Sequence, residues 1–311
     1  MNGIQLLFGI FLLFSIIGFG FTPLQAFVTV DGDQNINLND SPNISRLPDK
    51  SIIGNVDWQS IANFNRDSNI YKTSTPIGLL NIFYKGGSAS RCTAFLISDD
   101  LIMTNWHCAP SATEFKGARF YLDFLTGKNR NDFLKTPYYD CNNLVLTYRP
   151  LDVALLRCSG LPGRTNGKVK LEGEQRNYYP NPKIYVIHQN CDYHYTPGCA
   201  PTKKFSPVMM LSKSDGYGDL NNIDIFYDAD TLGGSSGSPV FLVENNKVIA
   251  LHHLGHNNSN GLANANADAD ADANANDDGR GVANSGVPMY KILSYIKEQL
   301  PELRDVVDLG K

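Results

Sequence analysis

The stretch "TLGGSSGSPVF" at residues 231–241 places three glycines and three serines directly before an apolar run. A flexible linker would explain the small residues. Linkers do not normally continue straight into "PVFLV", however, which has the β-branched and aromatic character of a buried strand. Glycines on both sides of Ser236 leave its backbone unshielded, so the hydroxyl can project from a tight turn. The stretch therefore predicts a turn of exposed backbone donors that leads into a core strand.

Outward from this turn, short runs rich in Val, Ile, Leu, Phe and Tyr recur, separated by clusters of Gly, Asn, Asp and Pro. The runs cover 77–84, 92–98, 101–106, 118–125, 144–149, 152–158, 183–189, 207–212, 223–228, 238–243 and 247–254. This pattern predicts an all-β protein made of antiparallel sandwiches or barrels. A helix is predicted only at 287–300, where Pro288 stands near the start and apolar residues recur at four-residue spacing.

The composition is typical of a globular protein, with 42% hydrophobic and 19% charged residues among 311. A formal net charge of −4 offers no basic field for nucleic acid or an anionic membrane. We therefore expect neither as a partner, and we expect a monomer. Residues 257–286 repeat Ala, Asn and Asp without an apolar face, which predicts a loop inserted between the last strand and the helix.

The N-terminus predicts export. Residues 4–20 form an uncharged apolar run, and Ala26 supplies a small residue at which a signal peptidase can cut. We interpret 1–26 as a signal peptide and expect a secreted or periplasmic protein that leaves the membrane once the signal is removed. A retained membrane anchor is the alternative, because the run nearly reaches spanning length. Residues 27–70, rich in Asn, Asp and Ser, are interpreted as a propeptide or N-terminal lead-in.

Cysteine and histidine residues raise the questions of disulfides and metal. Six cysteines in an exported chain predict disulfides, whose pairing the sequence alone leaves open. They are Cys92, Cys108, Cys141, Cys158, Cys191 and Cys199. The "HHLGH" run contains His252 and His253, but adjacent strand residues point to opposite faces and cannot easily share one ion. We therefore expect no metal and no cofactor.

Three residue types suggest nucleophilic catalysis. A serine attacks a carbonyl only if a base takes its proton, a further group orients that base, and preformed donors receive the oxyanion. Ser236 is the candidate nucleophile, with the N–H groups of Gly234 and Ser236 as oxyanion donors. His107 follows an apolar strand, and Asp152 enters another, where a carboxylate needs a partner. We therefore predict that Asp152 orients His107 toward Ser236.

These residues carry a resemblance to a known family. The blocks "TNWHC" at 104–108, "LDVALL" at 151–156 and "GGSSGSPVF" at 233–241 resemble, in that order, the His, Asp and Ser blocks of the chymotrypsin-like serine proteases. The order discriminates, because subtilisin-like and α/β-hydrolase enzymes arrange their triads differently. With the later "VIALHHLG", the chain is most similar to the bacterial glutamyl endopeptidase branch, over roughly residues 75–300.

The resemblance implies a fold. It implies two antiparallel six-stranded β-barrels with the site in the cleft between them, followed by a C-terminal α-helix. The expected domains are an N-terminal barrel at 71–165 with the His and Asp, a C-terminal barrel at 166–286 with the Ser, and a helix and tail at 287–311. It also implies that Cys92 pairs with Cys108, Cys141 with Cys158, and Cys191 with Cys199.

It also implies a function, namely a serine endopeptidase that acts on protein or peptide substrates through an acyl-enzyme. In glutamate-cutting relatives, a Thr and a His matching Thr231 and His252 hold the substrate carboxylate. Asp230 instead matches the acid with which trypsin-like enzymes bind Lys or Arg. Residues 27–70 would then delay assembly of the site, as in a zymogen, or wrap the second barrel. A catalytically silent binding protein on the same scaffold is the alternative.

Overall fold

A computed structural model describes residues 53, 56–127, 132, 135–176, 178, 182–190, 201–209, 223–257 and 281–303. All of them belong to one compact unit, Ser41–Lys311. The predicted signal peptide, most of the lead-in, Cys191, Cys199 and most of the 257–286 segment lie outside the described residues. Within the described ranges, the helices are too short or too polar to cross a lipid bilayer.

The first sheet contains seven antiparallel strands in the order β6-β5-β2-β3-β4-β8-β7. Their bounds are β2 Ile77–Tyr84, β3 Ala89–Leu96, β4 Leu101–Thr104, β5 Phe115–Tyr121, β6 Tyr139–Asp140, β7 Asn143–Tyr148 and β8 Val153–Arg157. One cluster of its buried side chains, among them Leu80, Leu96 and Phe120, forms the interior of this sheet. Strands β2, β4 and β8 are almost continuously apolar because both of their faces are buried, whereas β7 is only partly buried.

The second sheet contains eight strands. The path is β1-β11-β10-β13-β14-β15-β12, and β9 pairs with β14 in parallel. The bounds are β1 Gln59–Ser60, β9 Lys170–Leu171, β10 Lys183–Gln189, β11 Lys203–Met209, β12 Ile225–Tyr227, β13 Pro239–Leu242, β14 Lys247–Asn257 and β15 Gly281–Pro288. Its interior is a separate cluster that includes Ile184, Tyr227 and Val240.

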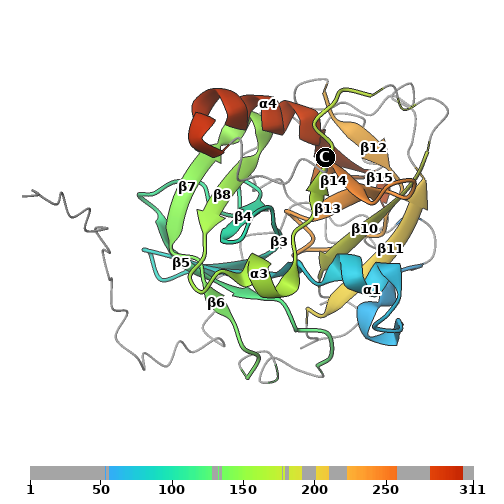
Figure 1. The fold of residues 1–311 in the computed structure, drawn as a ribbon, viewed down its shortest axis with the longest axis horizontal. Coiled ribbons are helices and arrows are strands. Elements are labelled where there is room, and N and C mark those ends of the chain that lie inside the picture. Colours follow the sequence, from blue (N-terminus) through green and yellow to red (C-terminus); the bar gives the residue numbers. More distant parts are fainter. Residues whose placement is uncertain are drawn as a thin grey trace, which may run out of the picture. The chain divides into compact units, whose positions relative to one another are not determined.

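The two curled sheets confirm the predicted all-β class. Without the two-residue strands β1, β6 and β9, each sheet has six strands. Figure 1 shows the two sets of strands next to each other, with α4 across one end. A third cluster joins them, because Phe95 and Leu155 of the first sheet pack with Phe241 and Leu251 of the second. Each such buried side chain contributes about 1.5–3 kcal/mol, so this cluster holds the two sheets together.

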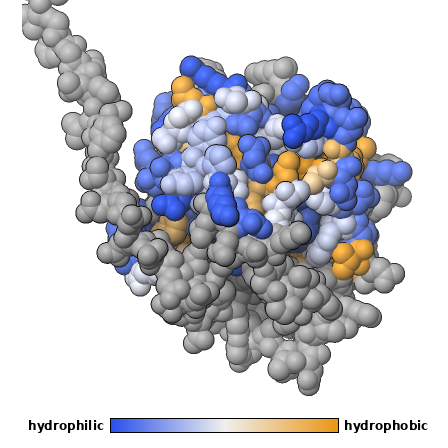
Figure 2. All heavy atoms as spheres, turned by 90° about the horizontal axis from the view of Figure 1, so that it is seen from below, coloured by the Kyte–Doolittle hydropathy of each residue, from blue (hydrophilic) through white to orange (hydrophobic). Residues whose placement is uncertain are grey.

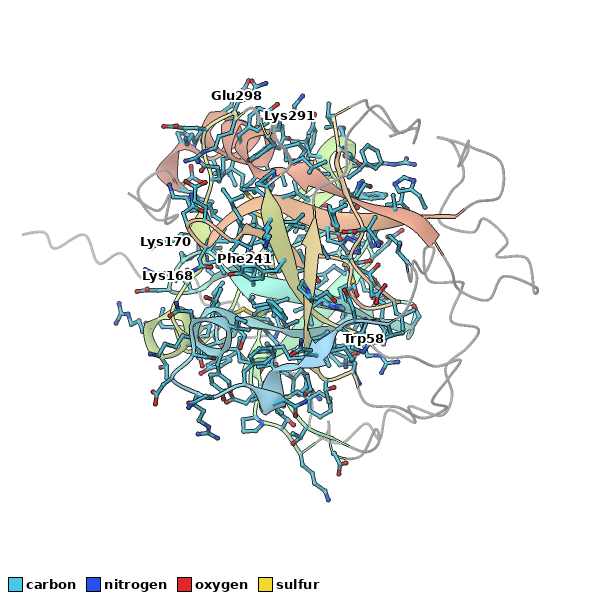
Figure 3. All side chains as sticks on the ribbon, turned by 90° about the vertical axis from the view of Figure 1, so that its right-hand side faces the viewer. Trp58, Lys168, Lys170, Phe241, Lys291 and Glu298 are labelled. Atoms are coloured by element: carbon cyan, nitrogen blue, oxygen red, sulfur yellow. A yellow bond between two sulfur atoms is a disulfide. The ribbon has the colours of Figure 1, made fainter. Side chains whose placement is uncertain are left out.

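Helices are few. The predicted C-terminal helix is α4, Met289–Gln299, which begins directly after Pro288. Its inner face buries Ile292 and Ile296 in the cluster that joins the sheets. Figure 3 shows Lys291 and Glu298 on the outer side of α4, and Phe241 in the interior. The other helices with bounds among the described residues have three to six residues, and no periodicity reveals them: η1 Ile61–Asn63, α1 Asn69–Ser74, η2 Arg149–Leu151, α3 Pro162–Asn166 and η4 Pro301–Leu303.

One strand lies where the sequence predicts a loop. Residues 281–286 belong to β15, which pairs with both β14 and β12. The small residues of this strand show no apolar alternation, so the sequence does not reveal it, but packing requires one of them, Gly286. A Cβ on Gly286 would lie only 3.0 Å from the Leu251 carbonyl oxygen and 3.1 Å from the Ala250 Cβ. The strand is therefore specified by close packing against β14, not by hydrophobic pattern.

Residues 59 and 60 of the lead-in form β1, which pairs with β11 at the edge of the second sheet. The described part of the lead-in thus packs on that sheet. On the face shown in Figure 2, polar residues predominate and apolar residues are scattered among them. Such scattering is usual for a protein surface.

Candidate active site

His107 and Asp152 meet because β4 and β8 pair. Their register sets Thr104 opposite Ala154, so the residues just after β4 adjoin those just before β8. The His107 backbone N–H donates to Asp152 Oδ1 at 3.0 Å, and His107 Nδ1 lies 2.8 Å from Asp152 Oδ2. Asn105 Nδ2 donates to the Asp152 carbonyl oxygen at 2.9 Å. The carboxylate therefore fixes both the backbone and the ring of His107.

The contacts of Asp152 and His107 determine which of their atoms carry protons. Burial by itself would raise the pKa of Asp152, but the neighbouring His107 and His253 hold that pKa well below its usual value. An ionised Asp152 accepts the proton of His107 Nδ1, which leaves Nε2 with a lone pair. Nε2 of His107 is buried and has no hydrogen-bond partner among the described residues. His107 can thus act as a base toward a group placed at Nε2.

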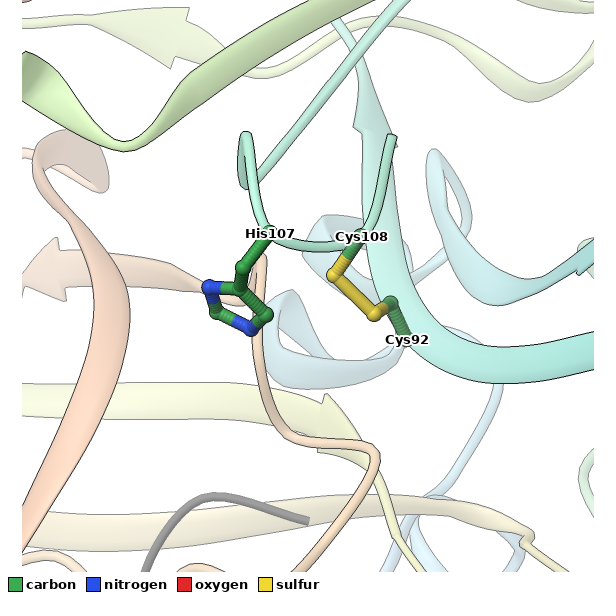
Figure 4. A group of neighbouring side chains, drawn as sticks. All are labelled: Cys92, His107 and Cys108. Atoms are coloured by element: carbon green, nitrogen blue, oxygen red, sulfur yellow. A yellow bond between two sulfur atoms is a disulfide. The ribbon is translucent and has the colours of Figure 1, made fainter. Parts of the chain in front are cut away.

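A disulfide anchors the loop that carries His107. Cys92 of β3 is bonded to Cys108, and Figure 4 shows His107 directly beside this bond. The sulfur atoms and the His107 ring lie close enough to resemble a metal site. Metal binding requires thiolates, which a disulfide does not provide. The second disulfide joins Cys141 to Cys158, so both pairings match those that the resemblance implies.

The Ser236 turn is built from hydrogen bonds and two left-handed glycines. Ser235 N–H donates to the Leu232 carbonyl at 2.9 Å, and Ser238 N–H donates to the Ser235 carbonyl at 3.0 Å. Gly234 and Gly237 have φ values of +101° and +85°, a region that favours glycine. The opening motif thus folds as the predicted turn.

Thr93 of β3 fastens this turn to the first sheet. Its N–H donates to the Ser236 carbonyl at 2.8 Å, and its hydroxyl donates to the Gly234 carbonyl at 2.8 Å. Thr93 follows Cys92, which is bonded to Cys108 beside His107. The turn and the His107 loop are therefore held by the same strand.

The two serines of the turn have different environments. The Ser235 hydroxyl is buried and lies 2.8 Å from His188 Nδ1, and it accepts the Leu232 N–H at 3.3 Å. The Ser236 hydroxyl is partly exposed and forms no hydrogen bond with any residue that the structure describes, His107 included. Ser235 is thus committed to the scaffold, whereas Ser236 is available for chemistry.

Sequence reasoning missed the support beneath this turn. His188 of β10 is fully buried and lies 3.0 Å from the Ser206 hydroxyl through Nε2. Burial, with Lys204 adding to it, lowers the pKa of His188 well below its usual value, so the ring is neutral. The only signal in the sequence was a histidine at the end of an apolar run, which is a common structural feature.

The amide groups of Gly234 and Ser236 complete the turn. Neither N–H donates to an acceptor within the described part of the chain. In the same turn, the amides of Ser235, Gly237 and Ser238 donate to backbone carbonyl oxygens. Two free N–H groups next to a serine hydroxyl are suited to bind a developing negative charge.

Asp230 lies just before this turn but points elsewhere. Its two carboxylate oxygens accept the backbone N–H groups of Ile53 at 2.9 Å and Asp57 at 2.7 Å. The side chain is almost fully buried, and burial raises its pKa. Burial and the neighbouring Asp230 likewise raise the pKa of Asp57 to about 6. The carboxylate of Asp230 is therefore occupied by the N-terminal segment.

Thr231 and His252 each contact residues of neighbouring strands. The Thr231 hydroxyl donates to Asn284 Oδ1 at 2.6 Å, and His252 Nδ1 lies 2.6 Å from the Tyr227 hydroxyl. The Tyr227 hydroxyl donates to the Ser285 carbonyl at 3.1 Å, so His252 Nδ1 donates to Tyr227. Burial, followed by the charge of His253, lowers the pKa of His252 to about 3. His252 is neutral near pH 7.

The amino-acid sequence of the chain matches a known protein family over the residues that carry this site. Residues 92–251 match the family described as trypsin-like peptidase domain. This match covers half of the chain, and the chain belongs to that family. The two disulfides agree with an extracellular location.

Individual relatives are more distant. "Secreted RxLR effector protein 73" of Plasmopara viticola is 28% identical over 199 residues, which are 60% of this chain and 47% of that protein. The chain thus spans about half the length of this curated relative. A solved Glu endopeptidase shares 18% identity at a TM-score of 0.53, covering 80% of this chain and 100% of the other. Protease Anisep from Arthrobacter nicotinovorans shares 12% identity at a TM-score of 0.52, covering 72% and 94%. These two structures show similarity of fold alone.

Proposed function

We propose that the chain is a serine endopeptidase in which Ser236 is the nucleophile, His107 the general base and Asp152 the residue that orients it. Ser236 Oγ attacks the peptide carbonyl while His107 Nε2 takes its proton, and the N–H groups of Gly234 and Ser236 receive the oxyanion. His107 then returns the proton to the leaving amine. Water hydrolyses the acyl-enzyme by the same steps.

One observation carries this proposal. His107 Nδ1 is bonded to an ionised Asp152 at 2.8 Å, while its buried Nε2 has no partner among the described residues. A buried nitrogen without a hydrogen bond costs free energy, so such groups are rare unless they have a role. In the proposed mechanism its partner is the Ser236 hydroxyl, which likewise forms no hydrogen bond with a described residue.

Covalent labelling tests the proposal. A fluorophosphonate should modify the purified protein once, and mass spectrometry of its peptides should place the modification on Ser236. Ser236→Ala should abolish labelling, whereas Ser235→Ala should be labelled, at a reduced rate because its hydroxyl supports the turn. If the folded parent is not labelled, the binding-protein alternative replaces the proposal.

We further propose a preference for Glu before the scissile bond, with Thr231 and His252 near the substrate carboxylate. The backbone contacts of Asp230 support this choice over Lys or Arg, because its carboxylate is already satisfied by two N–H groups. The neutral state of His252 adds a condition. A substrate carboxylate is attracted only to a protonated imidazole, so binding must raise the pKa of His252 and take up a proton.

Proton uptake makes the preference depend on pH. We expect the ratio of kcat/KM for matched Glu and Gln peptides to fall as pH rises, by up to about tenfold per pH unit while His252 is neutral in the free protein and protonated in the complex, and to level off above the pKa of His252 in the complex. The ratio should become independent of pH in His252→Asn. Faster cleavage after Lys or Arg than after Glu would contradict the preference and assign the pocket to Asp230.

We also propose that the protein is exported. The apolar run at 4–20 and the small residue Ala26 support a signal peptide. Two disulfides among the described residues are usual in oxidising compartments, and the curated relative is named as secreted. N-terminal sequencing of the protein from the culture medium tests this proposal, which predicts a start after Ala26, or a later one within 27–70 if that segment is removed as a propeptide; a start at Met1 would contradict it.

A further inference from the structure

A second ion-pair system adjoins the His107–Asp152 pair. His253 of β14 lies between two carboxylates, with Nδ1 3.3 Å from Asp152 Oδ2 and Nε2 2.6 Å from Asp224 Oδ2. The side chains of His253 and Asp224 are 8% and 5% exposed. The four side chains therefore form a continuous row, Asp224, His253, Asp152 and His107, of which the proposed mechanism uses only the last two.

The positions of the ring nitrogens indicate that His253 is an imidazolium. Both nitrogens face carboxylate oxygens, and only the protonated ring can donate from both. Burial by itself would lower the pKa of His253, but Asp224 and Asp152 raise it to about 10. The pKa of Asp224 is lowered in turn, because the charge of His253 outweighs the effect of burial.

The other groups that the structure describes beside His253 are a hydroxyl and two imidazoles. The Ser285 hydroxyl lies 3.3 Å from its Nε2. His256 and His252 are close enough to interact electrostatically, and burial together with the charge of His253 lowers their pKa values to about 4 and about 3. Near neutral pH, both are therefore uncharged. The row then contains two negative carboxylates and one positive imidazolium, for a net charge of −1 when His107 is neutral.

We propose that His253 is a positioning residue for Asp152. We further propose that the negative charge of Asp224 balances the positive charge that His253 places beside Asp152. A cation paired with Asp152 holds its Oδ2 toward His107, but it also weakens the stabilisation of the His107 imidazolium formed during catalysis. With Asp224 present, the row keeps the net charge of a single carboxylate. This inference rests on the proposed function of His107 and Asp152.

The pH dependence of kcat/KM separates this role from a structural one. In His253→Asn, two carboxylates remain without the cation, so His107 is easier to protonate. The acid limb of the profile should move to higher pH, on the order of one unit. In the double variant His253→Asn/Asp224→Asn, the net charge returns to −1, and the limb should return toward its original position. In Asp224→Asn alone, the acid limb should lie at the same pH as in the wild type or at a lower pH, because one negative charge is lost.

A second pair of variants tests the positioning role. The amide introduced by His253→Asn can still donate to Asp152 near the place of Nδ1, whereas the aliphatic side chain introduced by His253→Leu cannot. His253→Leu should therefore lower kcat, by up to about 100-fold as expected for a small misplacement of a reacting group, more than His253→Asn does. KM should change little. Identical acid limbs in the wild type, both single Asn variants and the double variant would overturn the proposal.

A readout without activity keeps this test independent of the proposed function. In NMR spectra of the ¹⁵N-histidine-labelled protein at pH 8, His253 should be protonated on both nitrogens, and its titration should move to lower pH in Asp224→Asn. A neutral His253 at pH 8 in the folded wild type would overturn the inference even if the protein is an active peptidase. Conversely, a charged His253 in a protein that fluorophosphonate does not label would reject only the proposed function.

Discussion

Asp152→Asn should reduce kcat/KM by about ten-thousand-fold at neutral pH, the size of loss found when this type of triad loses its carboxylate. The amide oxygen can still accept the His107 N–H, as Oδ1 now does at 3.0 Å. The amide nitrogen, however, would face His107 Nδ1 where Oδ2 now lies at 2.8 Å. His107 must then accept at Nδ1 and carry its proton on Nε2, so it cannot take the proton of Ser236.

Steady-state kinetics on a peptide substrate checks this prediction, with near-ultraviolet circular dichroism to show that the variant folds. Asp99→Asn is a matched control, because Asp99 forms ion pairs with Arg164 and Lys168 at an exposed position. Such surface pairs contribute about 0–1 kcal/mol, and activity should be unchanged. A loss below tenfold in folded Asp152→Asn would show that this carboxylate does not orient the base.

The fold was predictable where burial determines sequence. The runs at 77–84 and 183–189 coincide with β2 and β10, because strands covered on both faces are continuously apolar. Strands β15 and β1 were not predicted, for two different reasons. β15 consists largely of small residues, of which Gly286 is required by its close approach to β14, and β1 has only two residues, so neither produces a hydrophobic period.

The candidate site divides in a similar way. The meeting of His107 and Asp152 was predictable, because a carboxylate entering an apolar strand needs a partner and the motif order supplied one. The partners of His253 and His252 were not. Asp224 and Tyr227 lie at β12 and Ser285 lies in β15, where no motif marks them, and only the order β14-β15-β12 brings these residues together.

The same limit applies to Asp230. Its position before the turn suggested a pocket for a basic side chain. The structure shows its oxygens bound by the backbone of residues 53 and 57 instead. Backbone donors leave no trace in a sequence, because any residue can supply them. Contacts of this kind cannot be read from a sequence, in contrast to the pairing of His107 with Asp152, for which both side chains are visible in the motifs.

Gly237→Ala should destabilise the protein by about 2–5 kcal/mol, the sum of a left-handed conformation and an overpacked contact. Gly237 has φ +85°, and an added Cβ would lie 2.2 Å from the Thr93 carbonyl oxygen and 2.4 Å from the Thr104 hydroxyl. Both atoms belong to the β3–β4 hairpin, which also leads to His107. The turn must therefore move away from the first sheet, and the Thr93 bond to the Ser236 carbonyl should break.

Two control glycines separate the contributions to this effect. Gly87 has the same φ, +85°, but nothing lies within 4 Å of its added Cβ, and Gly86 is equally open without a left-handed backbone. In urea unfolding, Gly87→Ala should cost about 1–2 kcal/mol, whereas Gly86→Ala should be close to neutral. Because Gly237→Ala also displaces Ser236, it should lose fluorophosphonate labelling under conditions in which it remains folded. Equal costs for Gly237→Ala and Gly87→Ala, with labelling retained, would contradict the tight contact between the turn and the first sheet.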